Sequence, residues 1–327
     1  MKSKTIRIAI RNKVDAWLAS IEDEGVRGLA AKNTIITGGA IASMLLKEPV
    51  NDWDIYFRNW ETTYKVARYY LSRFNPQMKN GIKCRIYLAD ENNKEIHDNG
   101  SWTSNRIKIV VKSAGIASEK GTDKDYEYFE SRPAEDLAQS QYIGEVMTDA
   151  GEIEDTYEQT EQLSLGTDDD GKPKYRPVFM STNAITLSCK IQLVIRFFGD
   201  PEQIHENYDY IHCTNYWTSW DDKLELKKEA LEALLTKELR YVGSKYPICS
   251  LIRLRKFIGR GLTVNAGQML KMCSQVSKLD LTDIKVLEDQ LTGVDAAYFS
   301  QLLSALKAGG PDKIESAYLC EVIERLM

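Results

Sequence analysis

A mixed α/β sheet domain followed by an all-helical C-terminal domain is the fold class that the sequence predicts. Near the N-terminus, a β-branched run at 34–36 precedes an apolar helical segment and a second strand at 53–57. After residue 220, segment follows segment with apolar residues at helical spacing. The 327 residues also exceed the roughly 100–200 residues of one ordinary core, so two domains are expected.

The order of the elements follows from their periodicity. Helices are predicted at 6–22, from the glycine pair at 38–39 to about 47, at 61–74 and at 201–208, and further strands at 82–89, 106–113 and 190–198. Helical spacing returns at 224–239, 249–259, 266–279, 282–293, 295–309 and 312–327. The predicted domains are 1–215, with an acidic, partly disordered insertion at about 115–177, and a helical, basic domain at 216–327.

Composition excludes several classes of protein. Hydrophobic residues make up 43% and charged residues 28% of the chain, which is ordinary for a globular protein. No stretch offers the roughly 18 apolar residues that a membrane span needs, and the N-terminus has no signal-peptide core. A cytoplasmic protein without a membrane partner is therefore expected.

Cysteine and histidine are poorly arranged for metal binding. The six cysteines lie far apart and include no CxxC pair, so a zinc ribbon or dense disulfide framework is excluded and reduced core cysteines are expected. Only three histidines are present. Any metal is therefore expected to be held by oxygen.

Charge is segregated along the chain. Residues 119–176 contain 17 acidic and 6 basic side chains, so the rest of the protein carries a net charge of +6 although the whole carries −5. The acidic block is interpreted as a solvated loop, with a regulatory or nucleic-acid-mimicking flap as the alternative. Elsewhere, residues 237–278 contain nine basic side chains and one acidic side chain. On a helix, Arg253, Lys256 and Arg260 share one face, which predicts contacts with RNA phosphates or a triphosphate, or a solvated helix face.

Two aspartates form the strongest chemical signal. Asp52 and Asp54 flank one apolar residue on a predicted strand, so the two-residue period places both carboxylates on the same face. Such a pair suits magnesium, which takes oxygen ligands and bridges phosphates. The preceding Gly38 and Gly39 open a helix whose free N–H groups attract phosphate. The pair of signals is stronger than either alone.

The segment ITGGAIASMLLKEPVNDWDIYF resembles the opening motif of the polymerase-β-like nucleotidyltransferases, in particular the CCA-adding enzyme and poly(A) polymerase branch. The resemblance implies a nucleotidyltransferase palm, with two Mg²⁺ ions on Asp52 and Asp54. It also implies that Gly38, Gly39 and Ser43 cradle a nucleoside triphosphate. Ala42 and Ser43 depart from the arginine and aspartate that this branch usually carries.

A second, looser similarity begins at Tyr208. YDYIHCTNYW resembles the segment in which the family places an aspartate before an aromatic residue and an asparagine, which implies nucleotide contacts at Asp209 and Asn215. Many superfamily members add a third carboxylate from a neighbouring strand. Asp209 is the candidate for that third metal ligand, with a surface or helix-terminal acid as the alternative.

These observations predict a magnesium-dependent enzyme that transfers a nucleoside monophosphate to an acceptor, preferably a tRNA-like RNA 3′ end. Two alternatives stay open. One transfers the nucleotide to a protein or small molecule, and the other is a non-catalytic binding protein on the same fold.

Overall fold

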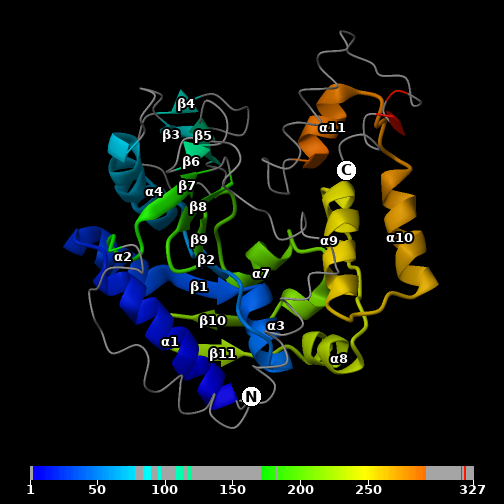
Figure 1. Ribbon diagram of the computed structural model, residues 1–327, viewed down its shortest axis with the longest axis horizontal. Coiled ribbons are helices and arrows are strands. Elements are labelled where there is room, and N and C mark those ends of the chain that lie inside the picture. The colour runs from blue at the N-terminus through cyan, green and yellow to red at the C-terminus, as the bar shows by residue number, and fades with distance from the viewer. Residues whose placement is uncertain are drawn as a thin grey trace. The chain divides into compact units, whose positions relative to one another are not determined.

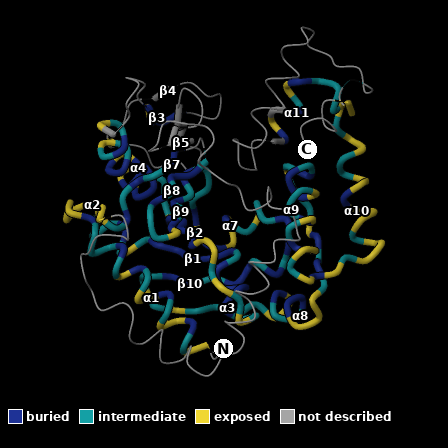
Figure 2. The backbone as a smooth tube through the Cα atoms, in the orientation of Figure 1, coloured by how far each residue is buried: buried dark blue, intermediate teal, exposed yellow. Residues whose placement is uncertain are grey.

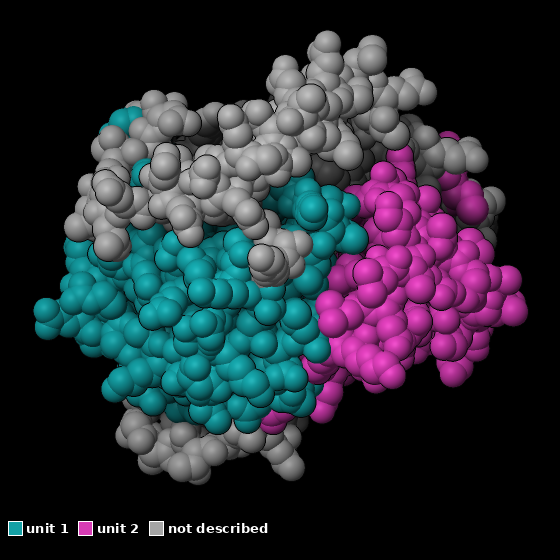
Figure 3. All heavy atoms as spheres, turned by 90° about the horizontal axis from the view of Figure 1, so that it is seen from below, with its two compact units in different colours: residues 1–122, 129–202, 215–226 teal, residues 123–128, 203–214, 227–327 magenta. Residues whose placement is uncertain are grey.

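The computed structural model describes residues 3–77, 84–89, 95–96, 108–112, 117–118, 171–180, 183–291, 318 and 320–321 (Figure 1). Most of the predicted acidic insertion and most of the chain after residue 291 lie outside the described residues. The chain divides into two compact units, which Figure 3 colours separately. Unit 1 comprises Met1–Thr122, Phe129–Glu202 and Asn215–Leu226, and unit 2 comprises Asp123–Tyr128, Gln203–Thr214 and Lys227–Met327.

An eight-stranded sheet forms the centre of unit 1, in the order β11-β10-β1-β2-β9-β8-β7-β6. Its strands are β1 (Thr34–Thr37), β2 (Trp53–Phe57), β6 (Ala117–Ser118), β7 (Pro177–Met180), β8 (Ala184–Leu187), β9 (Ile191–Val194), β10 (Tyr216–Thr218) and β11 (Lys223–Glu225). Neighbours are antiparallel except β2 and β9, which are parallel. A smaller sheet contains β3 (Arg85–Ala89), β4 (Glu95–Ile96) and β5 (Lys108–Lys112).

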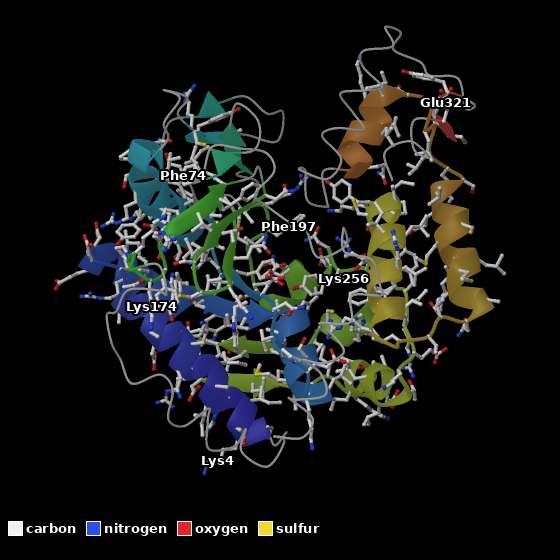
Figure 4. The ribbon with its side chains drawn as sticks, in the orientation of Figure 1. Lys4, Phe74, Lys174, Phe197, Lys256 and Glu321 are labelled. Atoms are coloured by element: carbon white, nitrogen blue, oxygen red, sulfur yellow. The ribbon has the colours of Figure 1, made fainter. Side chains whose placement is uncertain are left out.

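The described part of unit 1 contains the complete helices α1 (Ser3–Ala19), α2 (Glu24–Asn33), α3 (Gly39–Leu46) and α4 (Trp60–Phe74), and a 3₁₀ turn, η1 (Asn75–Gln77), follows α4. Side-chain caps fix the N-termini of α2 and α4. The Asp23 side chain accepts a hydrogen bond from the Val26 amide and the Asn59 side chain accepts one from the Thr62 amide, each at 2.9 Å. Phe74 ends α4 inside the core (Figure 4).

The two faces of the large sheet differ in chemistry. Ile36 and Ile55 lie opposite each other on β1 and β2, and both belong to the core cluster that also contains Trp17 of α1 and Tyr70 of α4. The Trp17 indole donates a 2.8 Å hydrogen bond to the Tyr70 hydroxyl, so the buried polar atoms of both rings are paired. The apolar face is therefore the one that the N-terminal helices cover. Figure 2 shows the burial of β1 and α3 in contrast to the exposure of α10.

Helices and one 3₁₀ turn make up the described part of unit 2: η3 (Ile211–Cys213), α8 (Lys228–Thr236), α9 (Pro247–Gly259), α10 (Ala266–Val276) and α11 (Ile284–Leu291). The short helix α7 (Pro201–His205) crosses the boundary between the units. Tyr210 is 1% exposed and donates a 2.7 Å hydrogen bond to the Ser250 carbonyl, while its ring meets Phe257 edge-on. Pro247 occupies the first turn of α9, where its missing N–H costs nothing.

Most local predictions in the described residues are confirmed. The strand at 53–57 has the predicted bounds, and the helices predicted at 6–22 and 61–74 appear as α1 and α4. The mixed α/β class is confirmed. The division at residue 215 into two domains and the all-helical C-terminal domain stay predictions.

Two local expectations are wrong. Residues 223–225 form β11 at the edge of the large sheet, where the sequence predicted the start of a helix, because pairing with β10 outweighs helical spacing. The cysteines are not all core residues: Cys84 and Cys249 are buried, whereas Cys273 and Cys320 are exposed.

Buried histidine makes the stability of unit 2 depend on pH. His212 is 2% exposed and packs edge-on against Phe257 at 4.5 Å between ring centroids, and its Nδ1 has no hydrogen-bond partner among the described residues. Burial, assisted by the Arg260 charge, lowers the pKa of His212 to about 4. The unfolded chain, with a histidine pKa of about 6.5, therefore binds more protons between those two values, and folding stability is lost as the pH falls through that window.

We expect the free energy of unfolding to fall between pH 7 and pH 5, with His212 contributing on the order of 2 kcal/mol. His212→Phe keeps an aromatic ring and removes the titration, so its stability should fall less steeply. Burial and the Lys227 charge also lower the pKa of His205 to about 3, so part of the pH dependence of the unfolding free energy should persist in His212→Phe. Urea titrations across this pH range measure the free energy of unfolding. An equal dependence of that free energy on pH in the wild type and in His212→Phe would contradict the role given to His212.

Candidate functional site on the polar face of the sheet

A glycine turn connects β1 to α3. Gly38 has φ 88° and ψ −145°, a backbone region that side chains with a Cβ rarely occupy, and it is the N-cap of α3 without a side-chain hydrogen bond. Gly39 is the first residue of α3, and a Cβ built there meets nothing within 4 Å. Gly38 is therefore required by the turn, whereas Gly39 is not required by steric contact.

Strand pairing gathers polar side chains on the face opposite the apolar core. Residues that pair across neighbouring strands point to the same side of a sheet. Thr37 pairs with Tyr216, Asp54 pairs with Gln192, and Gln192 pairs with Thr186. Because Ile36 and Ile55 pair and face the core, their neighbours Thr37 and Asp54 both face away from it. We call this set the polar row; it consists of Tyr216, Thr37, Asp54, Gln192 and Thr186.

The polar row contrasts with the residues one step along each strand. Thr37 is buried and the other four members are partly exposed. The apolar residues beside them are at most 3% exposed and share one core cluster; they are Trp217, Ile36, Ile55, Leu193 and Ile185. The members of the polar row other than Thr37 are thus partly accessible to solvent.

The two aspartates are placed as the sequence predicts along the chain. Asp54 is a partly exposed residue of β2, and exposed Asp52 immediately precedes that strand. The Trp53 amide donates to the Lys190 carbonyl at 2.8 Å, so the pairing of β2 with β9 begins between the two aspartates. Asp52 and Asp54 therefore lie on either side of the residue at which β2 begins.

Gln192 is the site residue that the sequence reading missed. It is the direct neighbour of Asp54 on β9, in the position where a carboxylate from an adjacent strand was expected. The alternating burial of β9, with Ile191 and Leu193 buried and Gln192 partly exposed, is the signal that could have identified it. Its amide offers one oxygen acceptor beside Asp54.

Asn215 and Ser43 have different surroundings. Asn215 is 1% exposed, and its backbone carbonyl accepts a 2.9 Å hydrogen bond from the Thr37 hydroxyl, so it lies beside the residue that precedes the glycine turn. Ser43 lies within α3, is 5% exposed, and its carbonyl accepts from the Glu48 amide. The structure therefore brings Asn215 to the turn, while Ser43 is enclosed by its own helix.

Asp209 belongs to unit 2, whereas Asp52 and Asp54 belong to unit 1. Its role as a third metal ligand stays a prediction. Asp209 Oδ2 accepts hydrogen bonds from Arg253 Nε at 2.8 Å and Arg253 Nη2 at 2.7 Å. Within the described ranges, no three His, Cys, Asp or Glu side chains gather closely enough to hold a metal ion. Asp209 acts as the counter-ion of Arg253 in this structure.

The predicted basic face of α9 is only partly available. Arg253 has 29% of its side chain exposed and is committed to Asp209. Lys256 and Arg260 are partly exposed, and Lys256 is marked on α9 in Figure 4. Arg255, which the prediction did not include, is exposed on the same helix.

Gly38→Ala should lower the free energy of unfolding by about 1–3 kcal/mol, because alanine is strained at φ 88°. The matched control is Gly39→Ala, which should leave stability unchanged or raise it by up to about 1 kcal/mol. Chemical denaturation of both variants measures the difference. Equal effects at the two positions would show that the turn does not require Gly38.

None of the helices in the described part of the chain is long and apolar enough to cross a membrane.

Comparison with known proteins identifies a curated relative, Gabija anti-defense 2 from Bacillus phage SPbetaL7. The two sequences are 22% identical over 124 residues, which cover 37% of this chain and 31% of the relative. The alignment thus spans about a third of that relative's length. No solved structure matches the chain.

The family model of the Gabija anti-defense 2 proteins matches residues 8–237, about 70% of the chain. The predicted membership of the nucleotidyltransferase superfamily, with RNA nucleotidyl transfer as its function, is therefore wrong. The reason is that its evidence was one short glycine and Asp-x-Asp motif and a looser similarity from Tyr208, whereas the family match extends over 230 residues. The associated expectations of ATP and metal binding receive no support from the match or from a three-ligand cluster in the described residues. The chain belongs to the Gabija anti-defense 2 family.

Proposed function

We propose that this protein counteracts the Gabija defence system by binding a protein component of that system. The observation that carries the proposal is the family match over residues 8–237. The matched range contains every strand of the eight-stranded sheet, whereas α9, α10 and α11 follow it. We therefore assign the shared activity to unit 1 and place its binding surface on the sheet face that carries the polar row.

The physical basis of this placement is the partial exposure of polar side chains. The opposite face is committed to the core, while Tyr216, Asp54 and Gln192 are partly exposed and lie in register. Protein interfaces combine such hydrogen-bonding groups with aromatic rings. RNA was the other predicted partner, and the commitment of Arg253 to Asp209 removes one member of the proposed phosphate-binding face.

The test is an infection assay in bacteria that carry Gabija. Expression of this protein should restore plaque formation by a Gabija-sensitive phage by at least about tenfold, and it should change nothing in cells without Gabija. Tagged protein should retain a Gabija component during purification at physiological salt. Failure to restore plaques with well-expressed, folded protein would reject the proposed function.

We also propose a divalent cation site at Asp52 and Asp54, which retains the Mg²⁺ and nucleoside triphosphate prediction in reduced form. Its support is the placement of Asp54 in the polar row, together with the uncapped start of α3 after Gly38. The expectation that the chain is an enzyme depends on this site and stays a proposal.

The available donors fit one cation better than two. Two carboxylates and the Gln192 amide supply three protein ligand groups, and Mg²⁺ commonly completes its shell with water and phosphate. Two ions would need further carboxylates, and Asp209 is held by Arg253 instead. A bound cation would place positive charge where phosphate oxygens could bind, with the first amides of α3 as additional donors.

Calorimetric titration of the full chain with Mg²⁺ alone should give one weak site that is lost in Asp52→Asn/Asp54→Asn. The matched control is Asp200→Asn, because Asp200 is an exposed acid of the same unit that pairs with Arg58. Addition of ATP should then strengthen binding only in the wild type and in the control. Identical titrations of wild type and the double variant would remove the cation site.

A further inference from the structure

A second surface feature of unit 1 is a cavity of about 270 Å³ at the hairpin between β10 and β11. Its wall includes Arg58, which follows β2, Glu202 of α7, Tyr216 of β10, and Trp220 and Asp221 of the hairpin turn. Tyr216 also belongs to the polar row, so the cavity adjoins the candidate site. Every residue of its lining lies in unit 1 and within the range of the family match.

The cavity already holds one guanidinium group. The Arg58 guanidinium carbon lies 4.7 Å from the centre of the Trp220 ring, and Arg58 Nε donates to Asp200 Oδ1 at 2.8 Å. A positive charge is therefore bound here by an aromatic face and a carboxylate together. Because 47% of the Arg58 side chain is exposed, this arrangement is open to solvent.

Two further carboxylates of the cavity lining, Glu202 and Asp221, accept their hydrogen bonds from uncharged groups. Glu202 accepts from the Tyr216 hydroxyl at 3.4 Å. Asp221 accepts from the Thr218 hydroxyl at 2.5 Å and from the Lys223 amide at 3.3 Å. Among the described residues no ion pair within 4.0 Å involves either one, because Arg58 binds Asp200 and the Lys223 ammonium binds Glu225 at 2.8 Å. Asp221 interacts with the Lys223 charge at longer range.

The described lining of the cavity therefore carries one more negative than positive formal charge. Three carboxylates and two cations line it, and Glu225 opposes Tyr216 across the strand pair. The pKa of Tyr216 is raised, first by burial and then by Glu202 and Glu225, which agrees with this excess of negative charge. A ligand that adds one positive charge and a flat surface complements both features.

We propose that this cavity receives an arginine side chain of the protein partner, whose guanidinium binds Glu202 and Asp221 beside the Tyr216 and Trp220 rings. The proposal rests on the proposed function, since the partner is a Gabija component. Arginine fits better than lysine because its planar group stacks on aromatic rings and forms paired hydrogen bonds with carboxylates. Anchors of this kind contribute strongly to interfaces.

The first experiment uses a peptide in place of the partner. Acetyl-Gly-Arg-Gly-amide is titrated into the ¹⁵N-labelled full chain, and the indole N–H signal of Trp220, assigned with Trp220→Phe, is followed. We expect a saturable shift with a dissociation constant in the millimolar range. The same peptide with citrulline in place of arginine has nearly the same shape without the charge and should produce no saturable shift.

Substitutions that remove the carboxylate charge distinguish a charge effect on peptide binding from a loss of folding. Glu202→Gln should weaken arginine-peptide binding about threefold or more, and Glu202→Gln/Asp221→Asn should abolish it. Glu24→Gln removes an acid from α2, outside the cavity lining, and should bind as the wild type does. Equal binding of arginine and citrulline peptides, or unchanged binding in the double variant with a native spectrum, would overturn the proposal. Preference for a lysine peptide would overturn the choice of arginine.

The second experiment tests the partner. Glu202→Gln/Asp221→Asn should reduce co-purification of the Gabija component about tenfold or more and should reduce the restoration of plaques. If wild type restores plaques and the double variant does so equally, the cavity proposal fails while the proposed function stands. If the arginine peptide binds the cavity but wild type never restores plaques, the proposed function fails instead, and the cavity is an arginine site for another protein.

Discussion

The pairing of β1 with strands on both sides is the constraint on which unit 1 depends. β1 has four residues, all buried, and it binds β2 through Ile36 and Ile55 and β10 through Ile36 and Trp217. Because side chains alternate, this register sends Ile36 into the core and Thr37 to the polar row. A slip by one residue would exchange the two faces, so the apolar core and the candidate site are fixed by the same hydrogen bonds.

The same register also fixes the position of the glycine turn. The β1 strand ends at Thr37, whose hydroxyl binds the Asn215 carbonyl, and Gly38 then turns the chain into α3 at a positive φ. Asn215 is 178 residues away in sequence, so its position beside the turn depends on the closure of a long loop. The polar row and the cavity share Tyr216 of β10, so they adjoin each other on unit 1.

In unit 2, neighbouring residues on one segment have opposite structural roles. Asp209 binds Arg253, while Tyr210 is buried among Phe257, Tyr241 and the Ser250 carbonyl. An aspartate held by two charge-assisted hydrogen bonds to arginine stabilises the packing of α9.

The sequence by itself determined the local elements, because apolar periodicity, caps and glycines act over a few residues: β2 at 53–57, α4 after Asn59 and the turn at Gly38 follow from neighbours in the chain. It also identified Asp52 and Asp54 as carboxylates beside one strand. It did not determine the partner of Asp209, the position of Gln192 beside Asp54 or the cavity at Trp220 and Arg58. Those were decided by tertiary structure alone, since strand register and ion pairing join residues that are far apart in sequence, and no local pattern encodes which distant strand becomes the neighbour.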